Sequence, residues 1–195
     1  MLQSAHDTID QRIFFNFDWD EFQRFLEIRS ERRGNRITYL DGVLEIMSPS
    51  HMHEGIKSRI GRLLELWATF EEVDLSSWGS TTLKKKRSKV GAEPDECYVV
   101  GRAEWPGRPD LAIEVSWTSG GIDKLEVYDR LEVPEVWFWE DDRLTIHVRK
   151  PRGGYAKRKK SALFPTLDIE TFSAHAADPD QPRAVRTFLA ALRKN

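Results

Sequence analysis

The chain has 195 residues, a formal net charge of -2 and one cysteine, Cys97. This length suits one domain with a substantial core, and a lone cysteine excludes both an internal disulfide and a cysteine-rich zinc site. The net charge excludes a generally cationic coat but permits a local basic groove. No apolar run reaches membrane-spanning length, and the first residues lack the pattern of a signal peptide. We therefore expect one cytoplasmic domain, residues 1–195, with no membrane partner.

Periodicity in the first part of the chain predicts two helices and a hairpin. Asp18 and Glu21 form a capping-box pattern at the start of a helix expected at about residues 18–32. In ITYLDGVLEIMS, the Asp41-Gly42 pair predicts a turn between two strands. An apolar stripe at helical spacing then predicts a second helix at about residues 51–70.

The rest of the chain alternates strands and helices. DLSSWGSTTLKKKR reads as extended, and EPDECYVVG, PDLAIEVSW, EVWFWED, RLTIHVRK and GYAKRKKS read as strands. Helices are expected at about residues 122–131 and 183–193. Such interleaving predicts an α/β or α+β fold built on one mixed β-sheet.

Two carboxylates stand on strands that should be buried: Asp95 in EPDECYVVG and Glu114 in PDLAIEVSW. A buried carboxylate is costly unless it is paired or binds a metal. A structural ion pair, or a strand with one hydrated face, is the alternative explanation. Asp110 shares the strand face of Glu114, but four residues at about 3.3 Å each place it roughly 13 Å away, too far for one metal ion. Asp95 can lie beside Glu114 if their strands are neighbours.

Lys124 is the cation that can reach this pair. Metal-dependent nucleases often carry a lysine two residues after the strand acid, and this chain has Ser116 there. Lys124 precedes apolar residues by three, four and seven positions, so it belongs to the buried face of its helix. Its ammonium either reaches water past a packed stem or reaches back over the strand end to Glu114.

Two further residues are candidates for the same site. His53 lies in the first turn of the second predicted helix, where it can cap, pack or join the site. Glu45, on a predicted strand, is a candidate third acid, with an exposed strand face as the alternative. HExxH, GxSxG, P-loop and GxGxxG patterns do not occur, which argues against those hydrolase, NTPase and dinucleotide-binding classes.

Basic residues cluster in two runs, which is the charge asymmetry that phosphate contact requires. Runs of this kind are more often solvated faces. The nucleic-acid-binding candidates are Lys84, Lys85, Lys86 and Arg87 in the first run and Lys157, Arg158, Lys159 and Lys160 in the second.

An ordered set of motifs resembles one known family. YLDGVLEIMSP with His53 soon after, EPDE, PDLAIEVSWTSGGIDKLEVY and VPEVWFW together resemble the Uma-two-type family, bacterial proteins described as restriction endonucleases and placed in the PD-(D/E)xK nuclease superfamily. The similarity runs from about Phe17 to Phe172. It implies a restriction-endonuclease-like core, in which a central mixed sheet is flanked by helices.

The resemblance also assigns site residues. Pro94-Asp95 matches the PD element and Glu114 the acid of the next strand. Ser116 occupies the usual lysine position, and Lys124 matches a lysine that this family carries on the following helix. His53 matches a histidine frequent after the SP element. Many members carry an acid where this chain has Gly120-Gly121, so the role of that acid is either unfilled or shifted to Asp123.

The resulting hypothesis is metal-assisted hydrolysis of phosphodiester bonds in nucleic acid, with DNA favoured over RNA. Asp95 and Glu114 would hold Mg²⁺ (or Mn²⁺), with Glu45 as a candidate third ligand. Lys124 would stabilise a hydroxide or the charge on phosphate oxygens, and His53 is a further catalytic candidate. The rival hypothesis is a catalytically inactive nucleic-acid- or protein-binding module on the same fold. A purely structural or oligomerisation domain is a third, and a homodimer stays open.

Overall fold

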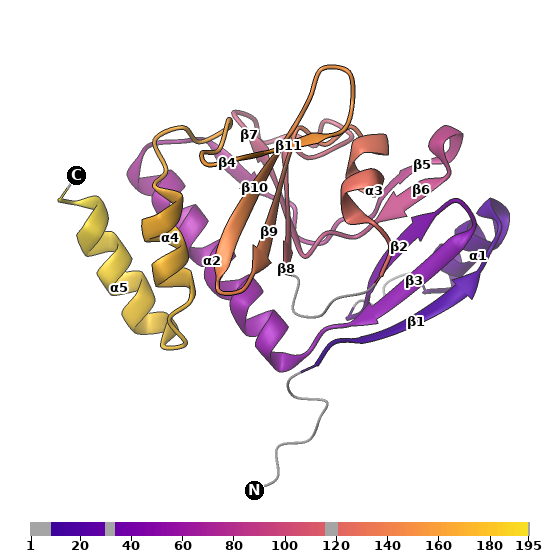
Figure 1. Cartoon of the computed structure of the whole chain (residues 1–195), viewed down its shortest axis with the longest axis horizontal. Coiled ribbons are helices and arrows are strands. Elements are labelled where there is room, and N and C mark those ends of the chain that lie inside the picture. Colours follow the sequence, from indigo (N-terminus) through magenta and orange to yellow (C-terminus); the bar gives the residue numbers. More distant parts are fainter. Residues whose placement is uncertain (1–8, 30–33, 116–120, 195) are drawn as a thin grey trace, which may run out of the picture.

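The computed structural model describes residues 9–29, 34–115 and 121–194 and contains two β-sheets (Figure 1). The smaller sheet has five antiparallel strands in the order β1-β3-β2-β6-β5. Their bounds are β1 Gln11–Asn16, β2 Arg36–Leu40, β3 Val43–Ser48, β5 Leu83–Lys85 and β6 Val90–Ala92.

The larger sheet has six strands in the order β11-β10-β9-β8-β7-β4 and is mixed, because β8 and β9 are parallel while the other neighbours are antiparallel. Its strands are β4 Leu75–Ser77, β7 Glu96–Val100, β8 Leu111–Val115, β9 Glu135–Glu140, β10 Arg143–Arg149 and β11 Tyr155–Arg158. All five residues of β8 are buried, so β8 forms the centre of the molecule.

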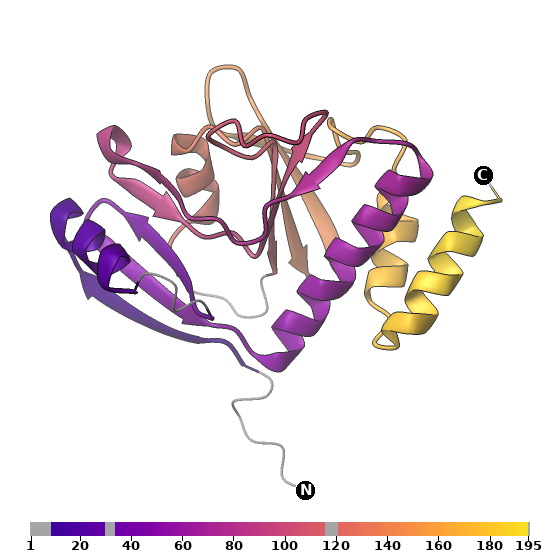
Figure 2. The ribbon, with the colours of Figure 1, turned by 180° about the vertical axis from the view of Figure 1, so that it is seen from behind.

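Helices cover both faces of the mixed sheet. Three of them, α2, α4 and α5, lie together on one face (Figures 1 and 2). They share one apolar cluster with the odd-numbered residues of β8. On the other face, α3 packs on Ala112 of β8 and also contacts β6, so its cluster joins the two sheets. The bounds are α1 Trp19–Arg29, α2 His51–Phe70, α3 Lys124–Arg130, α4 Ile169–Ala176 and α5 Gln181–Leu192, with a 3-10 turn at Lys86–Ser88.

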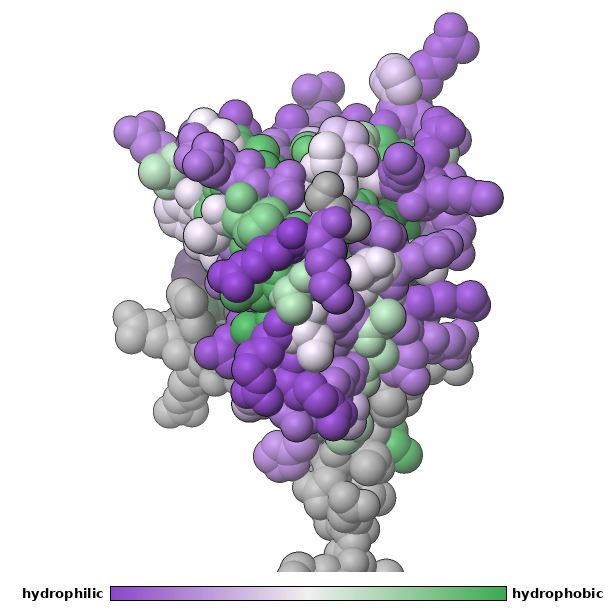
Figure 3. All heavy atoms as spheres, turned by 90° about the vertical axis from the view of Figure 1, so that its left-hand side faces the viewer, coloured by the Kyte–Doolittle hydropathy of each residue, from purple (hydrophilic) through white to green (hydrophobic). Residues whose placement is uncertain are grey.

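The longest helix, α2, follows directly from its sequence. Ser50 caps it, because its hydroxyl accepts a hydrogen bond from the His53 backbone N–H at 3.2 Å. Buried side chains then recur at helical spacing, including Ile56, Ile60 and Leu64. The C-terminal helix α5 has one buried side, which includes Ala184 and Phe188. The face of the molecule around α5 is largely hydrophilic (Figure 3).

The predicted mixed sheet with flanking helices is confirmed, and α2 has its predicted bounds. The expectation of a single sheet is incomplete, because a second, antiparallel sheet stands beside the mixed one. Strands β5 and β6 have only three residues each, and β1 is exposed at most positions. None of these three strands shows the alternation of apolar and polar residues by which strands are recognised. Helix α4 was also not predicted. Among the described residues, no helix combines the length and hydropathy needed to cross a bilayer.

Candidate active site

Strand pairing brings Asp95 and Glu114 together. Strands β7 and β8 are antiparallel neighbours with Glu96 opposite Ile113, so one step further along the register Asp95 stands beside Glu114. Asp95 Oδ2 accepts a hydrogen bond from the Val115 N–H at 2.8 Å. Both acids are buried, with exposures of 0% for Asp95 and 5% for Glu114. The neighbouring strands expected from the sequence are therefore confirmed.

Lys124 reaches this pair from α3. Its Nζ lies 3.1 Å from Glu114 Oε1, and the hydroxyl of Tyr128, one turn later on the same helix, donates to the same oxygen. Asp123 caps the helix by accepting from Leu125 N–H at 2.9 Å. Of the two positions that the sequence left open for the Lys124 ammonium, the structure has the one at Glu114, and a catalytic role for Lys124 stays a prediction. Ser116, the usual lysine position, lies outside the described residues.

His53 is held between two aspartates at the start of α2. Its Nδ1 lies 3.0 Å from Asp10 Oδ2 and its Nε2 lies 2.9 Å from Asp95 Oδ1. All three side chains have no solvent exposure. Asp10 also accepts from the Ser50 N–H at 2.8 Å, which ties the segment before β1 to the helix start. Both ring nitrogens of His53 are therefore committed to carboxylates.

Electrostatics favour the charged form of this histidine. Burial by itself lowers the pKa of His53, but the bonds to Asp10 and Asp95 outweigh it and raise the pKa to about 9. Burial would likewise raise the pKa of each aspartate, yet the imidazolium between them holds the pKa of both below the usual value. The arrangement is therefore a buried aspartate–imidazolium–aspartate chain.

Glu114 has the opposite environment. Burial and the nearby charge of Asp95 raise its pKa, although the Lys124 ammonium and the Tyr128 hydroxyl oppose the rise. The pKa of Tyr128 is raised well above its ordinary value by burial and by the Glu114 carboxylate, so its hydroxyl keeps its proton and acts as a hydrogen-bond donor. Two carboxylates side by side thus have their pKa values displaced in opposite directions, a common property of functional sites.

Arg36 adds a second cation on the Asp95 side. Its Nε lies 3.4 Å from Asp95 Oδ1, and its other end pairs with Glu54 at 3.2 Å. Neither Arg36 nor Asp10 was predicted from the sequence. Arg36 resembles any strand-edge arginine, and Asp10 precedes an exposed strand, so no pattern marks either residue.

Glu45 is buried but is engaged elsewhere. Its Oε1 lies 3.3 Å from Arg12 Nε, and its Oε2 accepts from the Ile122 N–H at 2.8 Å. Gly121, at a φ of +128°, leaves the space that this contact needs, since a Cβ there would lie 2.8 Å from Glu45 Oε2. A role for Glu45 as third metal ligand stays a prediction. Gly120 lies outside the described residues, and Asp123, the suggested substitute acid, serves as the α3 cap.

The oxygen atoms of the site suit a hard divalent cation. Asp95 is fully buried beside Glu114, and both side-chain donors to Glu114 use Oε1. Within residues 9–29, 34–115 and 121–194, no group of three His, Cys, Asp or Glu side chains forms a ready-made metal site. A cation here would therefore take two protein carboxylates and fill its shell with water, as Mg²⁺ commonly does.

Asp110 lies at the other end of β8, as its spacing from Glu114 requires. It accepts from the Val100 N–H at 3.0 Å and pairs with Arg102 at 3.1 Å. These bonds hold the loop that precedes β8. Asp110 is thus a structural residue of the strand start.

The two basic runs lie away from the carboxylates. Lys84–Arg87 lies at the turn between β5 and β6, and Lys157–Lys160 on and after β11. Both segments are in the upper half of Figures 1 and 2, whereas β8 ends lower in the ribbon and α2 starts lower still. Lys84 donates to Gln23 at 2.8 Å, and Lys85 pairs with Glu132 at 3.0 Å. Any nucleic-acid contact they make is therefore separate from the site of Asp95.

Comparison with known proteins supplies the remaining findings. Residues 19–176 match the Uma2 family model, described as "Putative restriction endonuclease". The fold is similar to a crystal structure of a "putative nuclease belonging to DUF820" from Anabaena variabilis, with a TM-score of 0.53 and 13% identity, covering 80% of this chain and 96% of that one. At this identity the likeness shows a common fold. No sequence among curated proteins matches the chain.

Proposed function

The chain belongs to the Uma2 restriction endonuclease family, and from this premise we propose that it is a metal-dependent endonuclease that hydrolyses phosphodiester bonds of nucleic acid, DNA in the first place. One observation carries the proposal. Asp95, Glu114 and Lys124, from two neighbouring strands and the following helix, converge at one end of β8. Two buried carboxylates with a lysine beside them are the groups that phosphodiester hydrolysis requires.

Asp95 and Glu114 would hold the cation through their carboxylate groups. A bound Mg²⁺ or Mn²⁺ polarises the scissile phosphate and lowers the pKa of an attacking water. Val115 N–H and His53 fix Asp95 from two sides, and Tyr128 fixes Glu114. The carboxylates are therefore oriented before any substrate arrives, which avoids reorganisation during the reaction.

Lys124 would stabilise negative charge as it develops. Its side chain is 18% exposed, so the ammonium faces both Glu114 and the outside, where a phosphate would approach. A cation placed before the reaction in a partly dry site stabilises charge more strongly than a cation in water does.

His53 would position Asp95 instead of accepting a proton. Both of its nitrogens already contact carboxylates, and its raised pKa of about 9 keeps the ring charged near neutrality. A general base needs a free lone pair within reach of the water. The sequence-based hypothesis of a catalytic His53 is thus narrowed to a positioning role.

The test compares cleavage of plasmid and single-stranded DNA in Mg²⁺ or Mn²⁺ with cleavage in EDTA. Asp95→Asn keeps the shape of the side chain and should abolish cutting, and Lys124→Ala should lower it by about 10²- to 10³-fold. Glu140→Gln is the matched control, because Glu140 is an exposed carboxylate at the end of the adjacent strand β9. Thermal melting verifies that each variant is folded.

Three outcomes oppose the proposal. Cutting in EDTA would contradict metal dependence, and full activity of Asp95→Asn would contradict the site. A wild type that neither cuts DNA nor releases heat on titration with Mg²⁺ or Mn²⁺ would favour the non-catalytic binding module.

A further inference from the structure

Two adjoining pockets form a furrow at the other end of β8. One has a volume of about 330 Å³ and lies between the β5 strand, the loop at Pro106–Arg108 and the end of α3. The other, about 280 Å³, lies between the start of β9, the end of β10 and the segment after β11. They share Arg108 and Glu132. We call the two pockets together the basic furrow.

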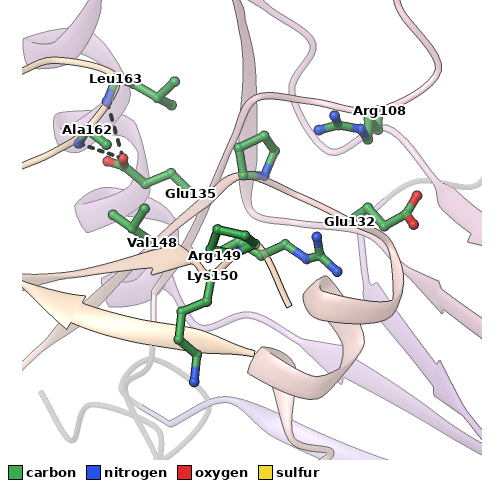
Figure 4. Close-up of a pocket in the computed structure, with 10 residues that line it drawn as sticks. Arg108, Glu132, Glu135, Val148, Arg149, Lys150, Ala162 and Leu163 are labelled. Carbon is green, nitrogen blue, oxygen red and sulfur yellow. Dashed lines mark hydrogen bonds between the residues drawn. The ribbon is translucent and has the colours of Figure 1, made fainter. Parts of the chain in front are cut away.

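Cations outnumber carboxylates in the lining of the furrow. The five that line it are Lys84, Lys85, Arg108, Arg149 and Lys150. Figure 4 shows the part around Arg149, where the guanidinium groups of Arg108 and Arg149 lie on the same side of the pocket. In a chain whose net charge is -2, such a concentration of one sign is a local feature and not the average of the surface.

The carboxylates in and beside the furrow do not cancel this charge. Glu132 pairs with Lys85 at 3.0 Å, and Asp129 pairs with Arg149 at 2.7 Å. Glu135 is buried and turns away from the arginines (Figure 4), accepting from the Ala162 N–H at 2.8 Å. No ion pair joins Arg108, Lys150 or Lys84 to a carboxylate among the residues that the structure describes. Three of the five cations therefore have no carboxylate partner in the described part of the chain.

The first basic run lines the furrow, and the second ends close to it in the sequence. Lys84 and Lys85 of the first run line it directly. The second run ends at Lys160, two residues before Ala162, which forms part of the wall. The cations that line the furrow thus come from segments more than sixty residues apart in the chain, with Lys84 and Lys85 in one segment and Arg149 and Lys150 in another.

Helix α3 connects the furrow with the carboxylate site. The helix begins at Lys124, which contacts Glu114, and its last turn carries Asp129, which holds Arg149 in the furrow. Along β8, Leu111 pairs with Glu135 at the furrow end, and Val115 binds Asp95 at the other end. Four strand residues separate the two ends by roughly 13 Å, about four nucleotide steps of 3.4 Å.

We infer that the basic furrow binds the phosphate backbone of a nucleic acid, with Arg108, Arg149 and Lys150 as contacts in addition to the two runs. The inference rests on the proposed function for its class of partner, but it requires no catalysis. Arginine forks suit phosphate oxygens. Arg108 and Lys150 have no ion pair among the described residues and can bind phosphate without prior loss of one, whereas Arg149 would contact both Asp129 and a phosphate. The furrow would hold the strand a few nucleotides from the site of cutting.

The test is DNA binding in EDTA, measured by fluorescence anisotropy of a labelled duplex between 50 and 200 mM salt. The variant is Arg108→Ala/Lys150→Ala, both exposed residues. The control is Arg143→Ala/Lys194→Ala, which removes the same charge from exposed positions outside the furrow. If each furrow residue contacts one phosphate, the salt slope of the variant falls by about 2, so wild-type affinity declines about tenfold more over this salt range.

Equal effects of the two double variants would overturn the inference, because net charge alone would then explain binding. Absence of wild-type binding would overturn it as well. Because the binding assay is done in EDTA, it tests the furrow independently of the nuclease proposal. Binding through the furrow without any cleavage would support the furrow as a DNA-binding site and contradict the nuclease proposal. Cleavage by the wild type together with normal DNA binding by the furrow variant would support the nuclease proposal and contradict the furrow as a DNA-binding site.

Discussion

At the scale of single residues, His53 links three parts of the chain. It lies in the first turn of α2, contacts Asp10 before β1 and contacts Asp95 before β7. Its charge compensates two buried carboxylates, with Arg36 as a second cation beside Asp95. The aspartate–imidazolium–aspartate arrangement orients Asp95 for its proposed role as a metal ligand. It also joins the segment before β1 to the mixed sheet.

Replacing His53 by alanine should lower the free energy of unfolding by about 3–5 kcal/mol, because removing one partner leaves buried charge uncompensated. Urea unfolding at pH 7 measures the change. His147→Ala is the control, since His147 is only partly buried and its ring bonds to Thr145. A loss below about 1 kcal/mol for His53→Ala would contradict the charged chain.

The same residue predicts a pH dependence. The pKa of His53 is raised from 6.5 to about 9, so its stabilising effect is complete below pH 6.5 and is lost as the pH rises through 9. Stability should therefore decline by about 3 kcal/mol over that interval. The lowered pKa values of Asp10 and Asp95 act on the acid side, where stability is lost as the pH falls below 3.8. Urea unfolding from pH 6 to 9.5 should show the alkaline decline in wild type and not in His53→Gln.

At the scale of elements, α3 is a short helix, and the position of Lys124 depends on it. It has 7 residues, and helices of this length are not stable alone in water. The Asp123 cap and the burial of Val127 and Tyr128 hold it in place. Because Lys124 is its first residue, the position of the ammonium depends on the start of this helix.

Asp123→Ala should therefore cost about 1 kcal/mol of stability and should also lower metal-dependent cleavage, because the first turn frays and Lys124 loses its fixed approach to Glu114. Asp123→Asn keeps a capping oxygen and should restore most of both quantities. Urea unfolding and the plasmid assay measure them side by side. If Asp123→Ala loses stability but retains full activity, the cap does not position Lys124.

At the scale of the whole molecule, packing joins the two sheets into one unit. The cluster around α3 contains residues of β6 from one sheet and of β8 and β9 from the other. Phe172 of α4 packs its ring 6.3 Å from Trp137 of β9 and 5.6 Å from Phe188 of α5. These contacts favour a single cooperative domain over residues 1–195, which stays a prediction.

One cooperative domain should give coincident urea transitions by far-ultraviolet circular dichroism and by tryptophan fluorescence. Phe172→Ala should shift both curves together and cost about 3–5 kcal/mol, because Phe172 is fully buried. Ile28→Ala, at an 82% exposed position of α1, should change stability by less than about 0.5 kcal/mol. Two separated transitions would show that the sheets unfold independently.

The sequence alone determined the elements with strong periodicity and the residues whose burial is anomalous. The bounds of α2 and the hairpin at Asp41-Gly42 could be predicted, and so could the place of Lys124 on the buried face of its helix, because local patterns encode which face of a helix or strand is buried. The sequence left open whether Lys124 reaches water or Glu114, and the structure places it at Glu114. Only the tertiary structure shows the second sheet, the contact of Asp10 with His53 and the position of Lys84, Lys85, Arg108, Arg149 and Lys150 at one furrow. Such contacts join positions far apart in the chain, and no local period marks which distant residue will become the partner.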